Sequence, residues 1–351
     1  MNKEKITIAV DAMGGDHAPR ITVEGVCLAL AEDPRVRILL IGDEQKIRTE
    51  LKEHAGFGER ITLVHTPDEI TMEDHPKEAI LQKPNASVLL AARLLSEGKA
   101  DAMVSAGSTG AVILSAATHI RRIPGVNRTA LGTVFPTLNE RQRPGIFSLM
   151  MDIGANVSNS ADDLVHFAYM GTSYAKKILR IAEPTVGLLN IGAEEHKGNE
   201  TMKQAYRLLS SRPDIEFIGN IEGNDLIKGK ADIIVSEGMT GNIAIKTMEG
   251  TSEAVKKIAK MAMKGKLIWK IGLLCLSGGI KKLMKVASYE EYGGAPIFGF
   301  DKLVIKSHGR SSAYAFKNGI RAAVRAVEDD MIPAMREAIA HFEAEKTKTV
   351  T

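Results

Sequence analysis

The sequence has 351 residues, 44% of them hydrophobic and 25% charged, so the chain is long enough to bury a large core. The formal net charge of +3 is too small to indicate the concentrated basic surface of a nucleic-acid-binding protein, and we predict no nucleic-acid partner. Cys27 and Cys275 both lie in apolar stretches and indicate neither a disulfide framework nor a thiolate metal site.

The N-terminal residues Met1 to Lys5 are polar and lack the apolar core of a signal peptide, so we expect a cytoplasmic protein. The longest apolar run, Ile271 to Leu276, is far shorter than the roughly 20 residues that a membrane-spanning helix needs. We therefore predict no membrane-spanning segment.

Short apolar runs alternate with amphipathic, helix-like segments such as Ile21 to Ala31 and Ser87 to Leu95. This alternation predicts an α/β fold with a mostly parallel sheet flanked by helices. The expected strands are Ile6 to Val10, Val36 to Ile41, Ile61 to Val64, Ala102 to Val104, Ala130 to Phe135, Ile146 to Met151, Val186 to Asn190 and Ile233 to Val235.

Glycine and polar residues gather directly after several of these strands. Ligands of parallel sheets bind beyond the carboxyl ends of the strands, so we expect these turns to form a polar site at one edge of the sheet. The turns are Asp11 to Asp16, Ser105 to Gly110, Asp152 to Asn156, Asn190 to Gly192 and Glu237 to Asn242.

The turn from Ser105 to Gly110 precedes a helical pattern, which would direct main-chain N–H groups toward an anion such as phosphate. The alternative is an ordinary turn in which Ser108 is only the helix N-cap. The turn from Glu237 to Asn242 has the same layout, with Lys246 one turn further along the expected helix.

Several familiar site classes are not favoured. No Gly-x-Gly-x-x-Gly motif follows the first strand, no phosphate loop ending in Gly-Lys-Ser/Thr is present, and Ser108 lies outside a Gly-x-Ser-x-Gly elbow. His17, His75, His196 and His308 are not spaced as metal ligands. We predict neither a metal nor a cofactor.

No linker, repeat or low-complexity tract divides the chain. We expect residues 1–344 to form a single interlocked α/β unit and residues 345–351 to form a polar tail. A helical, amphipathic projection is expected at about 252–288, because the part from Val255 to Ser288 carries nine lysines and no acidic residue.

A set of motifs in this order resembles the bacterial phosphate acyltransferase family of phospholipid synthesis, from about Ile6 to Val327. The motifs are Asp11-Ala-Met-Gly-Gly-Asp-His-Ala-Pro19, Ser105-Ala-Gly-Ser-Thr-Gly-Ala111, Asp152-Ile-Gly-Ala-Asn156, Gly187-Leu-Leu-Asn-Ile-Gly192, Lys197-Gly-Asn-Glu200, Gly238-Met-Thr-Gly-Asn-Ile243 with Lys246, Tyr292-Gly-Gly-Ala295 and His308-Gly-Arg-Ser311.

The resemblance implies that a fatty acyl group passes from an acyl-carrier-protein thioester to inorganic phosphate. It also implies a fold of the isocitrate/isopropylmalate dehydrogenase type, a homodimer, and delivery of acyl phosphate to a membrane glycerol-3-phosphate acyltransferase. Ser108, Glu237 and Met239 stand where the family pattern leads us to expect Asn, Asp and Phe. Glu237 keeps a carboxylate and Ser108 keeps a hydrogen-bonding group at these positions.

The reaction needs groups that hold a phosphate dianion and stabilise a developing oxyanion, because phosphate needs little deprotonation and the leaving thiol can depart with little or no protonation. We expect Lys246 and the Ser108–Thr109 turn to hold phosphate, and Asn242 to face the carbonyl, with His308 as a third catalytic residue. The expected substrate-binding residues are Asp11, Gly14, Gly15, Asp16, Gly107, Ser108, Thr109, Gly110, Asp152, Asn156, Asn190, Glu237 and Gly241.

Several of these residues also have a purely structural interpretation. Lys246 could be a solvated helix lysine, Asp11, Asp16 and Asp152 could cap turns, and Asn156 and Asn190 could tie loops together. The competing functions are an acyl-CoA-dependent acyltransferase, a membrane-peripheral scaffold without activity and, less favoured, a dehydrogenase.

The Lys-rich projection combines cationic and apolar side chains, as interfacial membrane binding requires. We expect it to contact an anionic membrane surface or the acidic acyl carrier protein, and the alternative is helix packing in a dimer. The expected contact residues are Lys264, Lys266, Leu267, Trp269, Lys270, Leu273 and Leu274.

Overall fold

The computed structural model describes residues 4–54, 56–142, 146–263 and 294–350. Its strands form one sheet with the order β3-β2-β1-β4-β11-β10-β5-β6-β9-β7-β8. The strands are β1 (Ile6–Asp11), β2 (Val36–Gly42), β3 (Ile61–His65), β4 (Ala102–Ser105), β5 (Ala130–Pro136), β6 (Phe147–Met151), β7 (Thr185–Leu189), β8 (Glu216–Ile221), β9 (Ile233–Val235), β10 (Ala295–Phe298) and β11 (Leu303–Lys306).

Helices cover both faces of this sheet, so the predicted α/β fold with a mostly parallel sheet is confirmed. The α-helices are α1 (Arg20–Glu32), α2 (Glu44–Leu51), α3 (Pro76–Gln82), α4 (Ser87–Ser96), α5 (Thr109–His119), α6 (Ala161–Tyr174), α7 (Glu200–Ser210), α8 (Asp225–Lys228), α9 (Gly238–Met263), α11 (Ala313–Glu328) and α12 (Met331–Val350). A short 3-10 helix covers Gly58–Arg60, and a π-helical turn at Ala175–Leu179 extends α6.

The sheet consists of two parallel halves that run in opposite directions. β10 pairs antiparallel with both β11 and β5, and β5 pairs antiparallel with β6, whereas the other strand pairs are parallel. Three successive reversals therefore separate β4 and β11 from β6, β9 and β7. The expectation that all the polar turns lie at one edge of the sheet is wrong, because the carboxyl ends of the two halves point in opposite senses.

The inner strands are largely buried on both faces, as parallel strands covered by helices usually are, whereas the edge strands β3 and β8 are partly exposed. In β1, Ile8 and Val10 belong to a core beneath α1, α6, α11 and α12, and Ala9 belongs to a second core beneath α4 and α5. This alternation follows from the two-residue period of a strand, which sends successive side chains to opposite faces.

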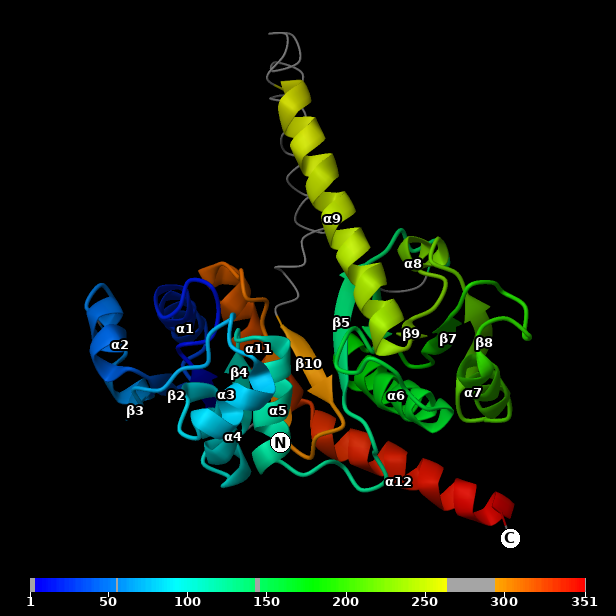
Figure 1. The fold of residues 1–351 in the computed structure, drawn as a ribbon, viewed down its shortest axis with the longest axis horizontal. Coiled ribbons are helices and arrows are strands. Elements are labelled where there is room, and N and C mark those ends of the chain that lie inside the picture. Colours follow the sequence, from blue (N-terminus) through cyan, green and yellow to red (C-terminus); the bar gives the residue numbers. More distant parts are fainter. Residues whose placement is uncertain (1–3, 55, 143–145, 264–293, 351) are drawn as a thin grey trace.

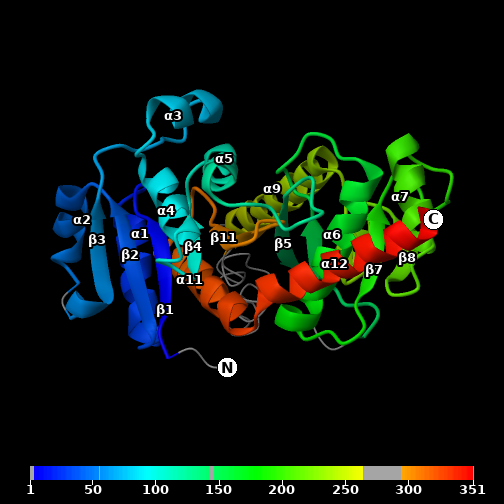
Figure 2. The same cartoon turned by 90° about the horizontal axis from the view of Figure 1, so that it is seen from below.

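Two lobes flank the central strands β5 and β10 (Figure 1), and α12 crosses toward the lobe that contains β7 and β8 (Figure 2). One continuous sheet joins the lobes. The grouping of residues 1–344 into one interlocked unit, with a separate tail, stays a prediction.

Helix α9 leaves the body between the lobes and projects away from it (Figure 1). Its outer half shows a stripe of exposed apolar side chains at a spacing of three residues, formed by Val255, Ile258 and Met261. The predicted projection at about 252–288 thus begins as a helix. The predicted contact residues Lys264, Lys266, Leu267, Trp269, Lys270, Leu273 and Leu274 lie outside the described residues. None of the helices in the described ranges is long and apolar enough to cross a membrane.

Candidate active site

A cavity of about 150 Å³ lies on one face of the sheet at its antiparallel centre. It brings together the three residues predicted to be catalytic, Asn242, Lys246 and His308, with the predicted substrate-binding residue Thr109. Its other lining residues are Leu131, Thr133, Val134, Ile153, Ile245, Glu249, Gly294, Ala295 and Lys306.

The turn after β4 brings the N-terminus of α5 to this cavity. The Ser105 hydroxyl accepts the Gly107 N–H at 3.0 Å, and the Ser108 hydroxyl accepts the Ala111 N–H at 3.3 Å. Ser108 is thus the N-cap of α5, which was the structural alternative for this residue. The cap also directs Thr109, the first residue of α5, to the cavity, so capping and an anion-binding role for the turn are compatible.

Asp11 is a buried structural acceptor beneath this turn. Its carboxylate accepts the Ser87 and Ser105 hydroxyls at 2.6 Å each and the Met13 N–H at 3.2 Å. Burial raises the pKa of Asp11, while the two serine hydroxyls and backbone N–H groups oppose this shift. The side chain thus ties β1, α4 and β4 together and serves as a structural acceptor.

The glycines and Asp16 beside Asp11 allow two turns to approach closely. A Cβ at Gly14 would lie 2.6 Å from the Gly107 nitrogen, and Gly15 has a φ of +109°, which an L side chain rarely adopts. The Asp16 N–H donates to the Gly309 carbonyl at 2.9 Å. These contacts hold the turn after β1 against the turns after β4 and β11.

On the other side of the cavity, α9 packs against the turn after β6. A Cβ at Gly241 would lie 2.0 Å from the Asp152 carbonyl oxygen, so only glycine permits this approach. The Asn242 amide donates to the Ile153 carbonyl at 2.9 Å, which fixes its side chain at the cavity wall. An asparagine amide has a second N–H, which this contact does not use.

Asp152 organises the turn after β6 from within the protein. The carboxylate accepts the Leu131, Gly154 and Ala155 N–H groups through one oxygen and the backbone and side-chain N–H groups of Asn156 through the other. Burial raises the pKa of Asp152, and these hydrogen bonds lower it in part. The fully buried Asp152 and the loop-tying Asn156 match the structural alternatives for these residues.

Two other predicted substrate-binding residues, Asn190 and Glu237, line a separate cavity of about 390 Å³ beyond α9. The Asn190 amide donates to the Lys197 carbonyl at 3.1 Å, and the Asn199 amide donates to Glu237 at 3.2 Å. These residues therefore close the loop after β7 and are not brought to the cavity that holds Asn242. Gly110 also packs away from it, since a Cβ there would lie 2.9 Å from Pro76.

The cavity has a cationic wall. Lys246 is half-exposed and forms an ion pair with Glu249 at 2.7 Å. The ring of His308 accepts the Arg310 N–H through Nδ1 at 3.2 Å, and burial together with Lys246 lowers the pKa of His308. At neutral pH His308 is therefore a neutral ring that carries its proton on Nε2 in this geometry.

Lys306 is a cavity residue that the sequence did not single out. It is only 7% exposed, and its ammonium donates to the Ser307 carbonyl. Burial, followed by the nearby charge of Lys246, lowers the pKa of Lys306 to about 8. The signal that could have found it is a lysine at the end of an apolar strand, two residues before the His308-Gly-Arg-Ser311 motif.

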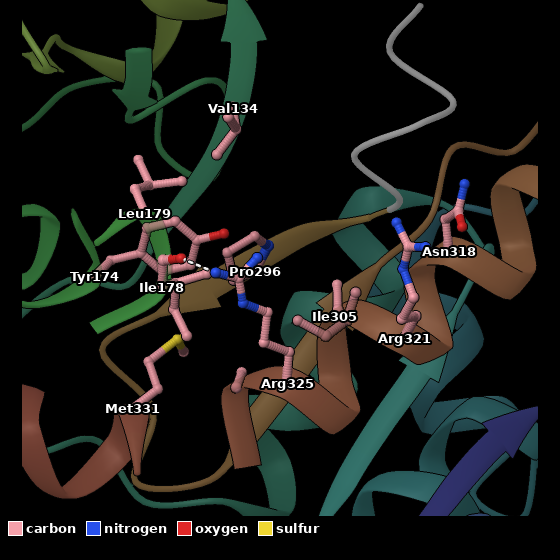
Figure 3. A pocket seen from close by; sticks show the side chains of 12 residues that line it. Val134, Tyr174, Ile178, Leu179, Pro296, Ile305, Asn318, Arg321, Arg325 and Met331 are labelled. Carbon is pink, nitrogen blue, oxygen red and sulfur yellow. Dashed lines mark hydrogen bonds between the residues drawn. The ribbon is translucent and has the colours of Figure 1, made fainter. Parts of the chain in front are cut away.

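A cavity of about 120 Å³ lies on the opposite face of the same strands, because Ile305 faces it and the next residue, Lys306, faces the first cavity. Apolar side chains form most of its wall, and the Arg325 guanidinium reaches the Ile178 carbonyl (Figure 3). None of the predicted site residues lines it. Within the described ranges, no three His, Cys, Asp or Glu side chains form a group that could hold a metal ion.

Comparison with known proteins gives a match over most of the chain. Residues 6–334 match the family model described as "Fatty acid synthesis protein". The phosphate acyltransferase of Geobacillus thermodenitrificans is 41% identical over 331 residues, which cover 94% of this chain and 98% of that protein. The phosphate acyltransferase of Dictyoglomus turgidum is 43% identical over 322 residues, covering 92% of this chain and 94% of that protein.

Solved structures show the same fold. A phosphotransacetylase from Streptococcus pyogenes superposes with a TM-score of 0.61 at 17% identity, covering 92% of this chain and 94% of that one. A branched-chain phosphotransacylase from Enterococcus faecalis superposes with a TM-score of 0.54 at 17% identity, covering 92% and 99%. The expected likeness to isocitrate/isopropylmalate dehydrogenases stays a prediction.

Proposed function

This chain belongs to the phosphate acyltransferase family, and from this premise we propose that it transfers a fatty acyl group from the thioester of acyl carrier protein to inorganic phosphate. The products are acyl phosphate and free carrier protein, which would supply phospholipid synthesis. Membership makes the protein an acyltransferase. The observation that supports the phosphate acceptor is the cavity in which Lys246, His308 and the N-terminus of α5 meet.

In the proposed reaction, a phosphate oxygen attacks the thioester carbonyl carbon. A carbon–oxygen bond forms, the carbonyl oxygen becomes an oxyanion, and the carbon–sulfur bond then breaks as the carbonyl re-forms. The sulfur leaves with the bonding electron pair as a thiolate, and the proton that the hydrogen phosphate loses on acylation ends on this sulfur, directly or through water. A thiol pKa near 8.5 makes this departure possible without a strong general acid.

The two sides of the cavity suit the two partners of this reaction. We assign phosphate to Lys246 and the Ser108–Thr109 turn, because a helix N-terminus and an ammonium both favour a dianion. We assign the carbonyl oxygen to Asn242, whose contact with Ile153 fixes the amide before substrate arrives. A fixed donor stabilises an oxyanion without reorganisation during the reaction.

The neutral His308 suits a hydrogen-bond donor to phosphate or to the carbonyl. A strong base is not required, because phosphate is already largely dianionic near neutral pH. Catalysis in this proposal therefore depends on holding two substrates in contact, and this is the role of a site built from fixed donors.

The direct test is incubation of the purified protein with long-chain acyl carrier protein thioester and labelled phosphate. We expect thiol release and labelled acyl phosphate in equal amounts, with acyl-CoA a poorer donor. Lys246→Ala is expected to raise the KM for phosphate, whereas Lys203→Ala, at a partly exposed lysine on α7 that also pairs with a glutamate, is the matched control. Absence of acyl phosphate with either donor would refute the proposed function, and nicotinamide binding would favour the dehydrogenase alternative.

We further propose that the protein is a homodimer that binds anionic membranes reversibly through the segment that follows α9. The lysines and apolar residues predicted for this contact lie outside the described residues, and the proposal is supported by their composition. The product would then form close to a membrane glycerol-3-phosphate acyltransferase. The same basic segment suits the acidic acyl carrier protein.

Sedimentation with anionic vesicles tests this second proposal. Binding is expected at low salt, is expected to weaken as salt is added, and is expected to fall with Leu273→Glu or Leu274→Glu while acyl transfer from a soluble donor persists. Binding that both substitutions leave intact would exclude the segment as the membrane contact.

A further inference from the structure

The geometry of the cavity points to a residue beyond those named above: we infer that Lys306 is the main phosphate-binding cation of this site. The inference rests on the proposed function, because it names the group that holds the phosphate acceptor. Lys306 is the last residue of β11, and its side chain faces the cavity next to Lys246 and His308.

The first argument is burial. Lys306 is 7% exposed, whereas the side chain of Lys246 is 53% exposed and already paired with Glu249. A hydrogen bond to a charged group gains strength where water is excluded. The less exposed of the two ammonium groups is therefore the stronger anion ligand, although both line the same cavity.

The second argument is the lack of a counter-charge. In the part of the chain that the structure describes, no carboxylate lies within ion-pair distance of the Lys306 ammonium, whose hydrogen bond goes to the neighbouring Ser307 carbonyl. An ammonium has three donors, so two remain for a ligand. Buried charges in proteins are normally paired, and an unpaired cation in a cavity calls for an anion.

A second buried lysine makes the contrast clear. Lys317, on α11, is 5% exposed, yet its ammonium pairs with Glu32 at 2.5 Å and lies over the Tyr314 ring at 4.3 Å. The same chain therefore satisfies one buried lysine internally and leaves the other directed at a cavity.

Other groups around Lys306 fit a dianion. Lys246 and Glu249 face it from α9, His308 follows it on the strand, and the fields of Asp16 and Asp11 reach it from the turn after β1. Thr109 places the N-terminus of an eleven-residue helix at the same cavity. A phosphate there would meet an ammonium and a helix N-terminus at once, and both attract negative charge.

Binding of inorganic phosphate, measured by isothermal titration calorimetry without an acyl donor, tests the inference. We expect Lys306→Met to raise the Kd for phosphate about 10- to 100-fold, the effect of losing one charge-assisted hydrogen bond. Lys317→Met, the matched control at a paired buried lysine, is expected to leave the Kd unchanged. Circular dichroism checks that both variants are folded.

Proton uptake on phosphate binding is a second measurement, and replacing Lys306 would not change it if this residue had only a structural role. Phosphate is already a dianion at pH 8.5, so protons taken up on binding report on the protein. We expect the wild type to take up roughly half a proton or more per phosphate at this pH, because a bound dianion favours the charged lysine. The Lys306→Met variant is expected to take up much less.

The outcomes separate this inference from the proposed function. An unchanged Kd in Lys306→Met, or a wild-type protein that binds no phosphate, overturns the role of Lys306. The assay of thiol release and acyl phosphate decides the reaction independently, since a wild type active in that assay with an equally active Lys306→Met variant would keep the reaction and remove the residue.

Discussion

Replacing Lys306 by methionine should stabilise the unliganded protein while it weakens phosphate binding. The pKa of Lys306 falls from 10.5 to about 8 on folding, mainly through burial. Each pKa unit corresponds to about 1.4 kcal/mol, so burying the charged form costs about 3 kcal/mol of stability at pH 7. Methionine has a similar length and no charge.

The hydrogen bond from Lys306 to the Ser307 carbonyl is lost in this variant, and this loss reduces the gain in stability by about 1 kcal/mol. We therefore expect the free energy of unfolding of Lys306→Met to exceed that of the wild type by about 2 kcal/mol at pH 7. Urea-induced unfolding followed by circular dichroism measures this as a higher midpoint at an unchanged slope.

The pH dependence of the free energy of unfolding tests whether the effect comes from the charge of Lys306. Between pH 8 and pH 10.5 the unfolded lysine keeps its proton while the folded one has lost it, so the stability of the wild type rises with pH through this window. The advantage of Lys306→Met should be full below pH 8 and should disappear by about pH 10.5.

The paired lysine again provides the control. Lys317→Met removes an ion pair with Glu32 and should lower the free energy of unfolding or leave it unchanged. A Lys306→Met variant that is less stable than the wild type at pH 7, or an advantage that persists at pH 10.5, would refute the reasoning.

Three further substitutions test the scaffold of the site. Asp11→Ala leaves the buried Ser87 and Ser105 hydroxyls without their acceptor and should cost about 3–5 kcal/mol in urea unfolding, and a loss below 1 kcal/mol would contradict the role of Asp11 as the shared acceptor. Gly241→Ala should lower kcat at least about tenfold, because its Cβ would displace α9 from the Asp152 carbonyl. Gly250→Ala, where no atom of the described residues lies within 4 Å of the added Cβ, is the control, and equal kcat values in the two variants would show that the close packing is dispensable. Ser108→Asn keeps an N-cap and should keep activity, whereas Ser108→Phe should obstruct the turn, and a fully active Ser108→Phe enzyme would place the turn outside the site.

The sequence was sufficient for the fold class and for most of the strands. Alternation of apolar runs with helical patterns predicted β1 to β7 and β9 to within a residue or two at each end. It did not predict β8, β10 or β11. Ala295–Phe298 and Leu303–Lys306 are separated by only the four residues 299–302, with no helical pattern between them, so they fall outside the β–α alternation from which most of the other strands were predicted.

Missing these central strands explains the wrong prediction about the sheet edge. The reversal of direction between the two halves is produced by β10, β5 and β6, and a β–α pattern alone assigns every strand the same direction. Thr109, Asn242 and Lys246 still come together, because the cavity lies over the reversing strands where turns from both halves meet.

Lys306 was missed for a related reason. A lysine at the end of a strand is usually solvent-exposed, and only its pairing between Ser105 of β4 and Ala295 of β10 reveals that it is enclosed. Burial of one charged residue is a property of the assembled sheet, which local sequence patterns do not report.

The length of α9 has a mechanical consequence. At 1.5 Å per residue, its 26 residues form a rod of about 39 Å, anchored at one end by the close contact of Gly241 with Asp152. If the rod pivots at this anchor by about 5°, its outer end moves by about 3 Å and Asn242 moves by only about 0.5 Å. A small tilt of α9 can therefore move its outer end by several ångströms while the Asn242 amide keeps nearly the same position at the cavity.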